Sequence, residues 1–442
     1  MATARALIVA AAGLAAVTPA PALAEREEVF AIVGAKVVTV SGPVLEPGTV
    51  ILRGGLIDAV GASLPMPAGA RVIDGRGLTV TPGLIDGFGG IGLPAAGSRT
   101  AATPGPPSSG EGGGSSDSLN PLAPQALVLE RIRAADALKE RDDGITTALV
   151  VPREGVLPGR SVLINLSGDS AEAMAVREPA ALHVHMATLA RRYPNSLMGT
   201  VALVRQALLD AARYREQWSA YEKAPAGKRR PVYDAALEAW SDVVAGKLPL
   251  VVTARRENDI RRALAIADEF NVRVVVADAR QAWRVADLIK ARGAPLLVSV
   301  NFDPPKPVAV FEAEDEERDA KEIQEAERNP AELYQAGVAF ALVSGHAPKF
   351  LAGVRKAIER GLPAEAALRA LTLGAAEALG IADRTGSLDK GKMANLVAWS
   401  GQPLTKEAKV KMVFVDGLLY EPEERSEPAS ASSPAAMPEA QR

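Results

Sequence analysis

The sequence contains no cysteine and only three histidines among its 442 residues. Without cysteine, the chain has no disulfide bond, no thiolate metal site and no cysteine nucleophile. With three histidines, a site that needs four imidazole ligands is excluded before any motif is considered. An excess of either charge is also missing, because 50 lysines and arginines stand against 53 aspartates and glutamates. A near-neutral chain has no basic footprint, which excludes general nucleic-acid binding.

The apolar run at residues 6–17 is typical of a secretory signal peptide. A positive charge precedes it, two prolines follow it, and Ala22-Leu23-Ala24 fits the small-x-small cleavage pattern. We therefore expect cleavage after Ala24 and a periplasmic or secreted mature protein; a membrane anchor or a buried first helix is the alternative. No later run reaches the ~18 apolar residues of a transmembrane helix, so no membrane contact is expected after processing.

Short β-branched runs mark both ends of the chain. Residues 31–80 contain several, separated by glycine and proline turns, and the pattern returns at 394–399 and 410–415. We therefore predict a small discontinuous β-sandwich domain built from both chain ends, residues 25–80 plus 386–420.

The long middle alternates buried-strand runs with amphipathic stretches. Strand and helix repeating over roughly 300 residues favour parallel βα units in an α/β fold, most economically a (β/α)8 TIM-like barrel at residues 81–385. A doubly wound open sheet is the alternative, although its Gly-x-Gly-x-x-Gly phosphate motif is missing after the first middle strand. The predicted strands lie within residues 144–151, 248–254, 272–277, 294–300 and 338–344. The predicted helices lie within residues 122–141, 196–221, 232–244, 258–270, 282–291 and 316–335.

Two segments have the composition of flexible chain. Residues 94–124 are rich in glycine, proline and serine, which predicts a mobile loop after the first barrel strand. The tail at residues 421–442 is rich in proline, glutamate, serine and alanine, and is predicted to be disordered.

The motif Val-Thr-Pro-Gly-Leu-Ile-Asp at residues 80–86 resembles the start of the barrel in the amidohydrolase superfamily, imidazolonepropionase-like branch. Residues 48–52 and 72–74 resemble the entry sandwich of that branch, and residues 367–392 resemble its exit helix and return to the sandwich. The ordered set covers nearly the whole mature chain. The resemblance implies metal-assisted hydrolysis of carbon–nitrogen or related bonds, in which a divalent ion lowers the pKa of bound water from about 15.7 to about 7.

The family holds its ion with a His-x-His on the first barrel strand, histidines on the fifth and sixth strands, and an aspartate on the eighth. The His-x-His positions here are Phe88 and Gly90, and neither a phenyl ring nor a hydrogen donates a lone pair. We expect Phe88 to fill part of the family's metal volume. The aspartate of the opening motif, Asp86, is retained; we interpret it as a turn or capping carboxylate, with support of a ligand in the pocket as the alternative.

The later ligand positions are also substituted. The fifth strand carries Thr253 and Arg255, the sixth Asp278, and the eighth Gly345. One carboxylate and one hydroxyl do not make a zinc site. Arg255 shares a strand face with Thr253, so its guanidinium would repel a cation at the barrel mouth. We expect that guanidinium to form an ion pair with Asp278 or Asp86.

The histidines form a second candidate site. His183 and His185 are two residues apart, which places both imidazoles on one strand face and would make a metal half-site. We interpret them instead as polar residues near a strand end. His346 follows the predicted eighth strand and is either a pocket-lining or a loop residue.

Two functions remain open. The first is an exported pseudoenzyme of the family without metal-dependent catalysis, which acts as a binding scaffold or as the partner of an active homologue. The alternative is a hydrolase of carbon–nitrogen (non-peptide) bonds in small or cyclic amides, with a rearranged or metal-independent site. The substituted ligands favour the first, so no cofactor is predicted although the family uses zinc or another divalent metal. The expected partners are an active homologue, a second copy of the chain, or a small molecule.

Overall fold

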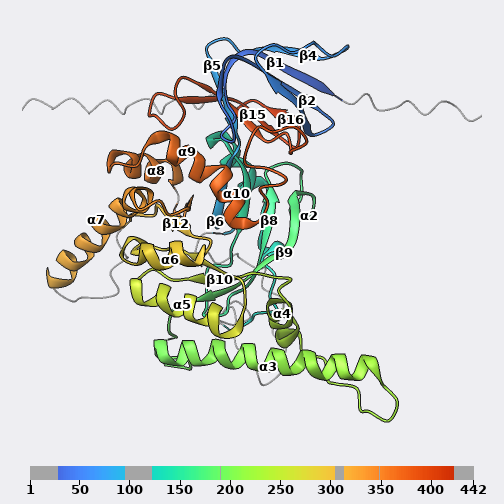
Figure 1. The fold of residues 1–442 in the computed structure, drawn as a ribbon, viewed down its shortest axis with the longest axis vertical. Helices are drawn as coiled ribbons and strands as arrows, with labels where there is room; N and C mark the ends of the chain where they lie inside the picture. The colour runs from blue at the N-terminus through green and yellow to red at the C-terminus, as the bar shows by residue number, and fades with distance from the viewer. Residues whose placement is uncertain (1–27, 95–121, 190, 304–312, 348, 423–442) are drawn as a thin grey trace, which may run out of the picture.

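The computed structural model describes residues 28–94, 122–189, 191–303, 313–347 and 349–422. The predicted signal peptide lies outside the described residues, as do nearly all of the predicted mobile loop and of the predicted tail. In the part that is described, no helix combines the length and the apolar character of a membrane span. A sheet made from both chain ends lies at one end of the molecule, and a curled sheet with helices around it fills the rest (Figure 1).

The terminal sheet joins the two ends of the chain by strand pairing. β14 runs antiparallel to β5, with Val397 opposite Thr81. The rings of Phe30 and Phe414 meet edge to face with 5.2 Å between their centroids, so the two ends also share a core. The predicted β-sandwich is not confirmed, because these strands hydrogen-bond in one sheet of order β16-β15-β14-β5-β1-β2-β3, with β4 beside β1. The strands are β1 (Val29–Val38), β2 (Val44–Arg53), β3 (Leu56–Gly61), β4 (Arg71–Asp74), β5 (Leu78–Pro82), β14 (Leu396–Ser400), β15 (Lys409–Val415) and β16 (Leu418–Tyr420).

The middle of the chain curls into a TIM-like barrel whose strands follow one another in chain order. β6 to β11 form one sheet, and β12 and β13 form a parallel pair. A parallel bridge between Val276 and Leu296 connects β11 to the start of β12, and the Gly345 N–H donates to the Phe88 carbonyl oxygen at 3.1 Å, which returns the circle to β6. The strands are β6 (Leu84–Gly89), β7 (Ile145–Val150), β8 (Gly159–Asn165), β9 (Ala175–His185), β10 (Leu250–Thr253), β11 (Val274–Ala277), β12 (Leu297–Ser299) and β13 (Ala341–Val343).

The third barrel strand departs from the predicted all-parallel arrangement. β8 runs antiparallel to both β7 and β9, with Val162 opposite Val150 and Gly159 opposite His183. The connection from β7 to β8 contains two prolines and Gly155 within residues 151–158, and such a segment does not form the helix that a parallel crossover needs. The expectation of uniform βα units was therefore wrong at this strand.

The predicted helix at residues 122–141 was also wrong. The backbone of Leu122 pairs with Leu157 and that of Leu127 with Arg160, so the first part of the segment is bound to the β7–β8 connection and β8 instead of coiling. Only short turns follow, namely η1 (Leu129–Arg131), α1 (Ala134–Ala137) and η2 (Leu138–Asp143). The apolar residues of this amphipathic segment are buried without a helix, because its backbone groups hydrogen-bond to the neighbouring strand instead.

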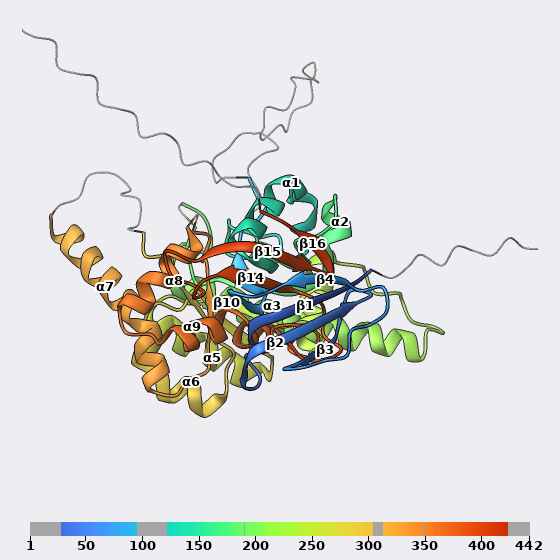
Figure 2. The same cartoon turned by 90° about the horizontal axis from the view of Figure 1, so that it is seen from above.

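The remaining predicted helices are present and cover the outside of the barrel (Figure 2). Apolar side chains alternate along the strands: Val251 and Val275 belong to the barrel interior, whereas Val252 and Val276 pack outward. The barrel therefore has a packed centre and an outer layer under the helices, as the period of the strands requires. The helices are α2 (Ala171–Met174), α3 (Leu197–Lys223), α4 (Ala235–Val244), α5 (Glu257–Phe270), η3 (Ala282–Val285), α6 (Ala286–Arg292), α7 (Ala313–Gln335), α8 (Phe350–Glu359), α9 (Ala364–Leu371) and α10 (Leu373–Leu379).

Candidate functional site

The candidate residues of the sequence meet at one end of the barrel, which we call the barrel mouth. Thr253 ends β10 and lies opposite both His185 of β9 and Ala277 of β11. Asp278 follows β11 directly, and His346 follows β13 by three residues. Carboxyl ends of parallel strands lie on the same side of a barrel, and catalytic groups of TIM-like barrels are found there. The mouth is therefore the end at which a function is sought.

An aromatic ring occupies the centre of the mouth. Phe88 is 2% exposed and belongs to the barrel interior. Its centroid lies 6.2 Å from the His183 ring and 5.4 Å from the His346 ring, which it meets edge on. The two-residue spacing of His183 and His185 thus gives two interior imidazoles, the first of them fully buried. Placing His183 only near a strand end underestimated its depth.

The guanidinium of Arg153 occupies the space beside Gly90. Arg153 follows β7, is half-buried, and donates from Nη2 to the Gly90 carbonyl oxygen at 3.3 Å. A Cβ on residue 90 would overlap Nη2, Nε and Cζ of this guanidinium. Sequence reasoning missed Arg153, although an arginine that comes two residues after a buried strand run is a recognisable signal at this end of a barrel.

The predicted ion pair of Arg255 is confirmed with Asp278. Arg255 Nε lies 2.5 Å from Asp278 Oδ2, and Arg280 Nε lies 3.5 Å from Asp278 Oδ1. The carboxylate side chain is 3% exposed, whereas that of Arg255 is 62% exposed, so the guanidinium reaches the pair from solvent and does not enter the barrel. Asp278 has φ of 53°, a left-handed conformation that Asp and Asn tolerate better than other side chains.

Asp86 links the first and eighth barrel strands. The Ser344 hydroxyl donates to Oδ2 at 2.6 Å, and the N–H groups of Ser344 and Phe88 donate to Oδ1 at 3.0 Å and 3.3 Å. Burial raises the pKa of Asp86, and these three donors oppose the shift. The Phe88 contact, two residues on, is the turn contact expected from the sequence. The contacts with Ser344 add a cross-strand link that sequence reasoning did not give.

Gly345 leaves no room for a side chain, including the aspartate that the resemblance implies at this position. Its φ is 57°, and a Cβ would overlap the Ser299 hydroxyl. His346, the next residue, has φ of 66°. Backbone conformations of this kind gather at functional sites, where the surrounding structure holds them.

The three imidazoles are held in their neutral form. Burial, followed by the charge of Arg255, lowers the pKa of His185 from 6.5 to about 4. Burial, followed by the charge of Arg153, lowers the pKa of His346 from 6.5 to about 3. Burial, followed by the other two histidines, lowers the pKa of His183 well below 6.5. At neutral pH the positive charge of the mouth therefore comes from its guanidiniums.

The mouth does not suit a divalent cation. Within the described ranges, no three His, Asp or Glu side chains are grouped so that they could hold an ion. The carboxylate oxygens of Asp278 already face two guanidiniums, and Arg153 fills the space next to Gly90. Among the residues that the structure describes, His183 and His185 have no third ligand, so the metal half-site is not completed there. Residues that repel a cation and leave no open ligand set do not fit the zinc site of the family.

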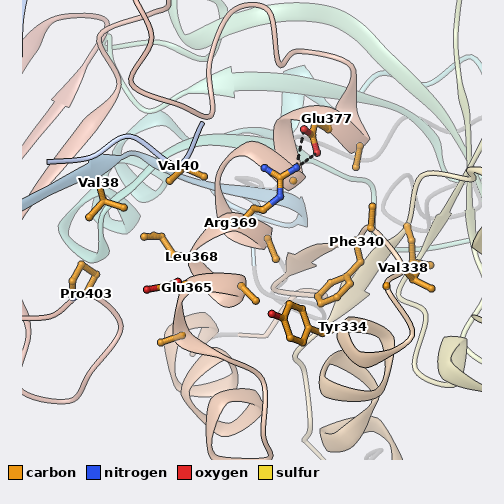
Figure 3. Close-up of a pocket in the computed structure, with 18 of the residues that line it drawn as sticks. Val38, Val40, Tyr334, Val338, Phe340, Glu365, Leu368, Arg369, Glu377 and Pro403 are labelled. Atoms are coloured by element: carbon orange, nitrogen blue, oxygen red, sulfur yellow. Dashed lines mark hydrogen bonds and ion pairs between the residues drawn. The ribbon is translucent and has the colours of Figure 1, made fainter. Parts of the chain in front are cut away.

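A separate cavity of about 1500 Å³ lies between the terminal sheet and the barrel (Figure 3). It is lined by residues that precede β12 and β13, such as Phe340, so it lies at the opposite end of the barrel from the mouth. Its cations are already used: Lys36 pairs with Glu46 at 3.3 Å and Arg369 with Glu377 at 3.0 Å. The third, Lys290, donates to the Ala336 carbonyl oxygen at 2.9 Å. The cavity therefore has a largely apolar wall, and each of its three cations already has a partner.

Comparisons with known proteins agree with the barrel. Residues 269–419 match the sequence model of the amidohydrolase family. An amidohydrolase from Thermotoga maritima is similar in structure, with a TM-score of 0.74 and 24% identity over 89% of this chain and 100% of that chain. A prolidase complexed with N-methylphosphonate-L-proline has a TM-score of 0.54 and 18% identity, over 89% of this chain and 99% of that chain. An adenosine deaminase from Xanthomonas campestris with bound zinc has a TM-score of 0.51 and 16% identity, over 88% and 92%.

These likenesses bear on fold more than on activity. At such identities a structural match shows a shared fold, and function must be argued from the site. No protein of curated function matches the sequence. The predicted superfamily is nevertheless the one that both kinds of match name. Residues 269–419 thus match the amidohydrolase family model, and the barrel is similar in fold to the solved amidohydrolase structure.

Proposed function

We propose that this protein is an exported member of the imidazolonepropionase-like branch of the superfamily whose barrel mouth binds a ligand without metal-dependent catalysis. The observation that carries the proposal is the guanidinium of Arg153 beside Gly90, in the space that a side chain at residue 90 would need. In this proposal the Arg153 guanidinium takes the place of the metal-ligating side chain that the resemblance implies at residue 90. The proposal thus rests on the arginine that occupies this space.

Electrostatics supports this choice. Two unit charges 4 Å apart interact by about 4 kcal/mol at an effective dielectric constant of 20, so a divalent ion at that distance from one guanidinium is disfavoured by roughly 8 kcal/mol. The mouth holds Arg153, Arg255 and Arg280, and Asp278 is already shared by the last two. A hydroxyl at Thr253 and neutral imidazoles do not offset that repulsion.

The alternative remains a hydrolase of carbon–nitrogen (non-peptide) bonds in small or cyclic amides. The three unprotonated imidazoles at the mouth favour it, because histidine is the commonest general base. Their pKa values weaken the case: about 4 for His185 and about 3 for His346 lie far below the neutral range in which a general base is effective. We therefore favour ligand binding over catalysis as the function of the mouth.

Metal analysis of the mature protein tests the proposal. Protein purified without chelator and then dialysed is expected to carry well under one equivalent of zinc, manganese or iron. Stoichiometric metal that survives dialysis and disappears in a His183→Ala/His185→Ala variant would refute the proposal and move the site to that pair. Turnover of cyclic amides that is insensitive to chelator, and lost in His346→Ala, would establish the alternative.

Export and partnership belong to the same proposal. N-terminal sequencing of periplasmic material is expected to begin at Glu25, and material that begins at Met1 would contradict export. Light scattering of the mature protein, alone and mixed with a histidine-complete homologue from the same genome, is expected to reveal a complex with the homologue or with a second copy. A monomer in both samples leaves small-molecule binding as the role of the scaffold.

A further inference from the structure

Unpaired polar atoms gather at the barrel mouth. Apart from Asp278 Oδ1 and Arg280 Nε, which form an ion pair at 3.5 Å, buried nitrogen and oxygen atoms of five side chains there have no hydrogen-bond partner among the described residues. Buried polar groups in native proteins are nearly always hydrogen-bonded, and each one left unpaired costs about 1–3 kcal/mol. Several in one place indicate a polar ligand better than scattered ones do. The atoms are Arg153 Nε, both ring nitrogens of His183, His185 Nε2, Thr253 Oγ1 and His346 Nδ1.

The charge of the mouth selects the sign of that ligand. Electrostatic interactions connect His346 to Arg153, Arg255, His185 and Asp278. Arg131 and Glu154 act on Arg153 in the same way. Contacts place the guanidiniums of Arg153, Arg255 and Arg280 at the mouth, against Asp278 and the deeper Asp86, which is bonded to Ser344. Three positive groups against two carboxylates, with the opposite charges of Arg131 and Glu154 offsetting each other, leave an excess that attracts an anion.

The hydrogen-bond donors of the mouth lie at different depths below the protein surface. Arg255 reaches solvent, Arg153 and His346 are half-buried, and His183 is fully buried beside the Phe88 ring. A guanidinium presents two parallel N–H groups that fit a carboxylate or phosphate in bidentate fashion, and Arg153 uses only one nitrogen, on the Gly90 carbonyl. A neutral imidazole adds one N–H, and the Thr253 hydroxyl adds another donor. Such a group of donors is complementary to an oxyanion.

We propose that the barrel mouth binds an oxyanion, the carboxylate or phosphate group of a small molecule, in the fork of Arg153. His346 and Thr253 supply further donors to the same group, and the exposed Arg255 attracts the anion to the mouth. This inference deepens the proposed function and rests on it in one respect, that the mouth holds no metal ion. An oxyanion that pairs with Arg153 uses the free Nε, which has no other partner in the described chain.

Proton NMR of the intact mature protein follows the site directly, because the chain has only three histidines. Single His→Gln variants assign the three imidazole C2–H signals. Inorganic phosphate, acetate and chloride are titrated separately at matched ionic strength. Phosphate or acetate is expected to shift the His346 signal saturably with a Kd on the order of 1 mM, which corresponds to about −4.1 kcal/mol. Whichever of the two binds more tightly identifies the group as phosphate or carboxylate.

Variants of Arg153 separate charge from geometry. Arg153→Gln is expected to weaken binding at least about tenfold, and Arg153→Lys, which keeps the charge but loses the fork, to fall between it and the parent. Arg292→Gln is the matched control, because Arg292 ends α6, beside the cavity at the opposite end of the barrel, and pairs with Asp268 at 2.6 Å. If Arg153→Gln does not fold, Thr253→Val, which keeps the His346 signal, provides the second measurement, with an expected loss of about threefold.

Several results would overturn the inference. Identical shifts with chloride, or unchanged binding in a folded Arg153→Gln protein, would refute an oxyanion site. Metal analysis of the same samples keeps the two proposals apart. Anion binding that requires a bound metal and disappears with chelator would refute the proposed function, because the anion would then be a ligand of the ion. A metal-free protein that ignores both anions would refute this inference alone.

Discussion

Replacing Asp278 tests the ion pair at the mouth. The carboxylate is 3% exposed and faces Arg255 at 2.5 Å and Arg280 at 3.5 Å. Breaking a fully buried pair costs about 3–5 kcal/mol. Here the Arg255 side chain is 62% exposed, so its guanidinium regains water when the carboxylate is removed and the full figure is discounted. The loss of hydrogen bonds to a charged group then contributes about 2 kcal/mol.

The backbone adds a second cost that one variant removes. Residue 278 has φ of 53°, where alanine is disfavoured by about 1–2 kcal/mol and asparagine is tolerated. Asp278→Ala is therefore expected to lower the free energy of unfolding by about 3–4 kcal/mol, and Asp278→Asn by about 2 kcal/mol.

Urea unfolding followed by circular dichroism measures both losses on the mature protein. Asp268→Ala is the control, because Asp268 pairs with Arg292 on the surface, and such a pair is worth about 0–1 kcal/mol. An Asp278→Ala protein that unfolds like the parent would refute the ion pair. Equal losses for the alanine and asparagine variants would refute the backbone contribution.

Three further predictions follow from the mouth. Phe88→His/Gly90→His is expected to gain neither zinc nor amidase activity and to lose stability, because a side chain at residue 90 overlaps Arg153; stoichiometric zinc by metal analysis would contradict this. Gly345→Asp is expected to destabilise the fold by more than the ~1–2 kcal/mol that a left-handed backbone costs, because the new Cβ overlaps Ser299. Gly391→Asp is the control that measures the backbone cost alone, because Gly391 has φ of 85° and no atom near its Cβ position. Equal melting temperatures of the two variants would contradict the prediction. The pKa values of His185 and His346 are about 4 and about 3 in the folded protein, against 6.5 when exposed, so the neutral imidazoles favour the folded state above pH 6.5. The free energy of unfolding is therefore expected to fall as the pH decreases from 6.5 towards 3, and to fall less steeply in His346→Gln. Parallel pH profiles of the unfolding free energy for the parent and the variant would contradict this.

Local signals in the sequence were sufficient for most of the elements. The period of the apolar residues placed the strands β7, β10, β11, β12 and β13 and the helices α3 to α7, because burial on one or both faces imposes that period on the chain. The same signal failed at residues 122–141, where an amphipathic stretch pairs with a neighbouring connection and strand. It also did not reveal that β8 is reversed, because strand direction depends on the connection and not on the run itself.

Site prediction shows the same division. From the sequence we predict that Phe88 and Gly90 stand where the superfamily has histidines, and this remains a prediction. The sequence also paired Arg255 with Asp278 or Asp86, and the pair forms with Asp278 on the neighbouring strand, since residues after parallel strands lie side by side. It did not find Arg153, which no motif marks and which reaches Gly90 across 63 positions of the chain.

The sequence by itself therefore determined the class of fold and the resemblance to the amidohydrolases, since both depend on residue type and order. Only the tertiary structure decided which side chains meet at the mouth. Arg153, His183 and His346 lie far apart in the chain, and their closeness results from curling the strands into a barrel. Charge, burial and unpaired donors are properties of that arrangement, because electrostatic interactions and desolvation depend on distance in space and not on distance along the chain.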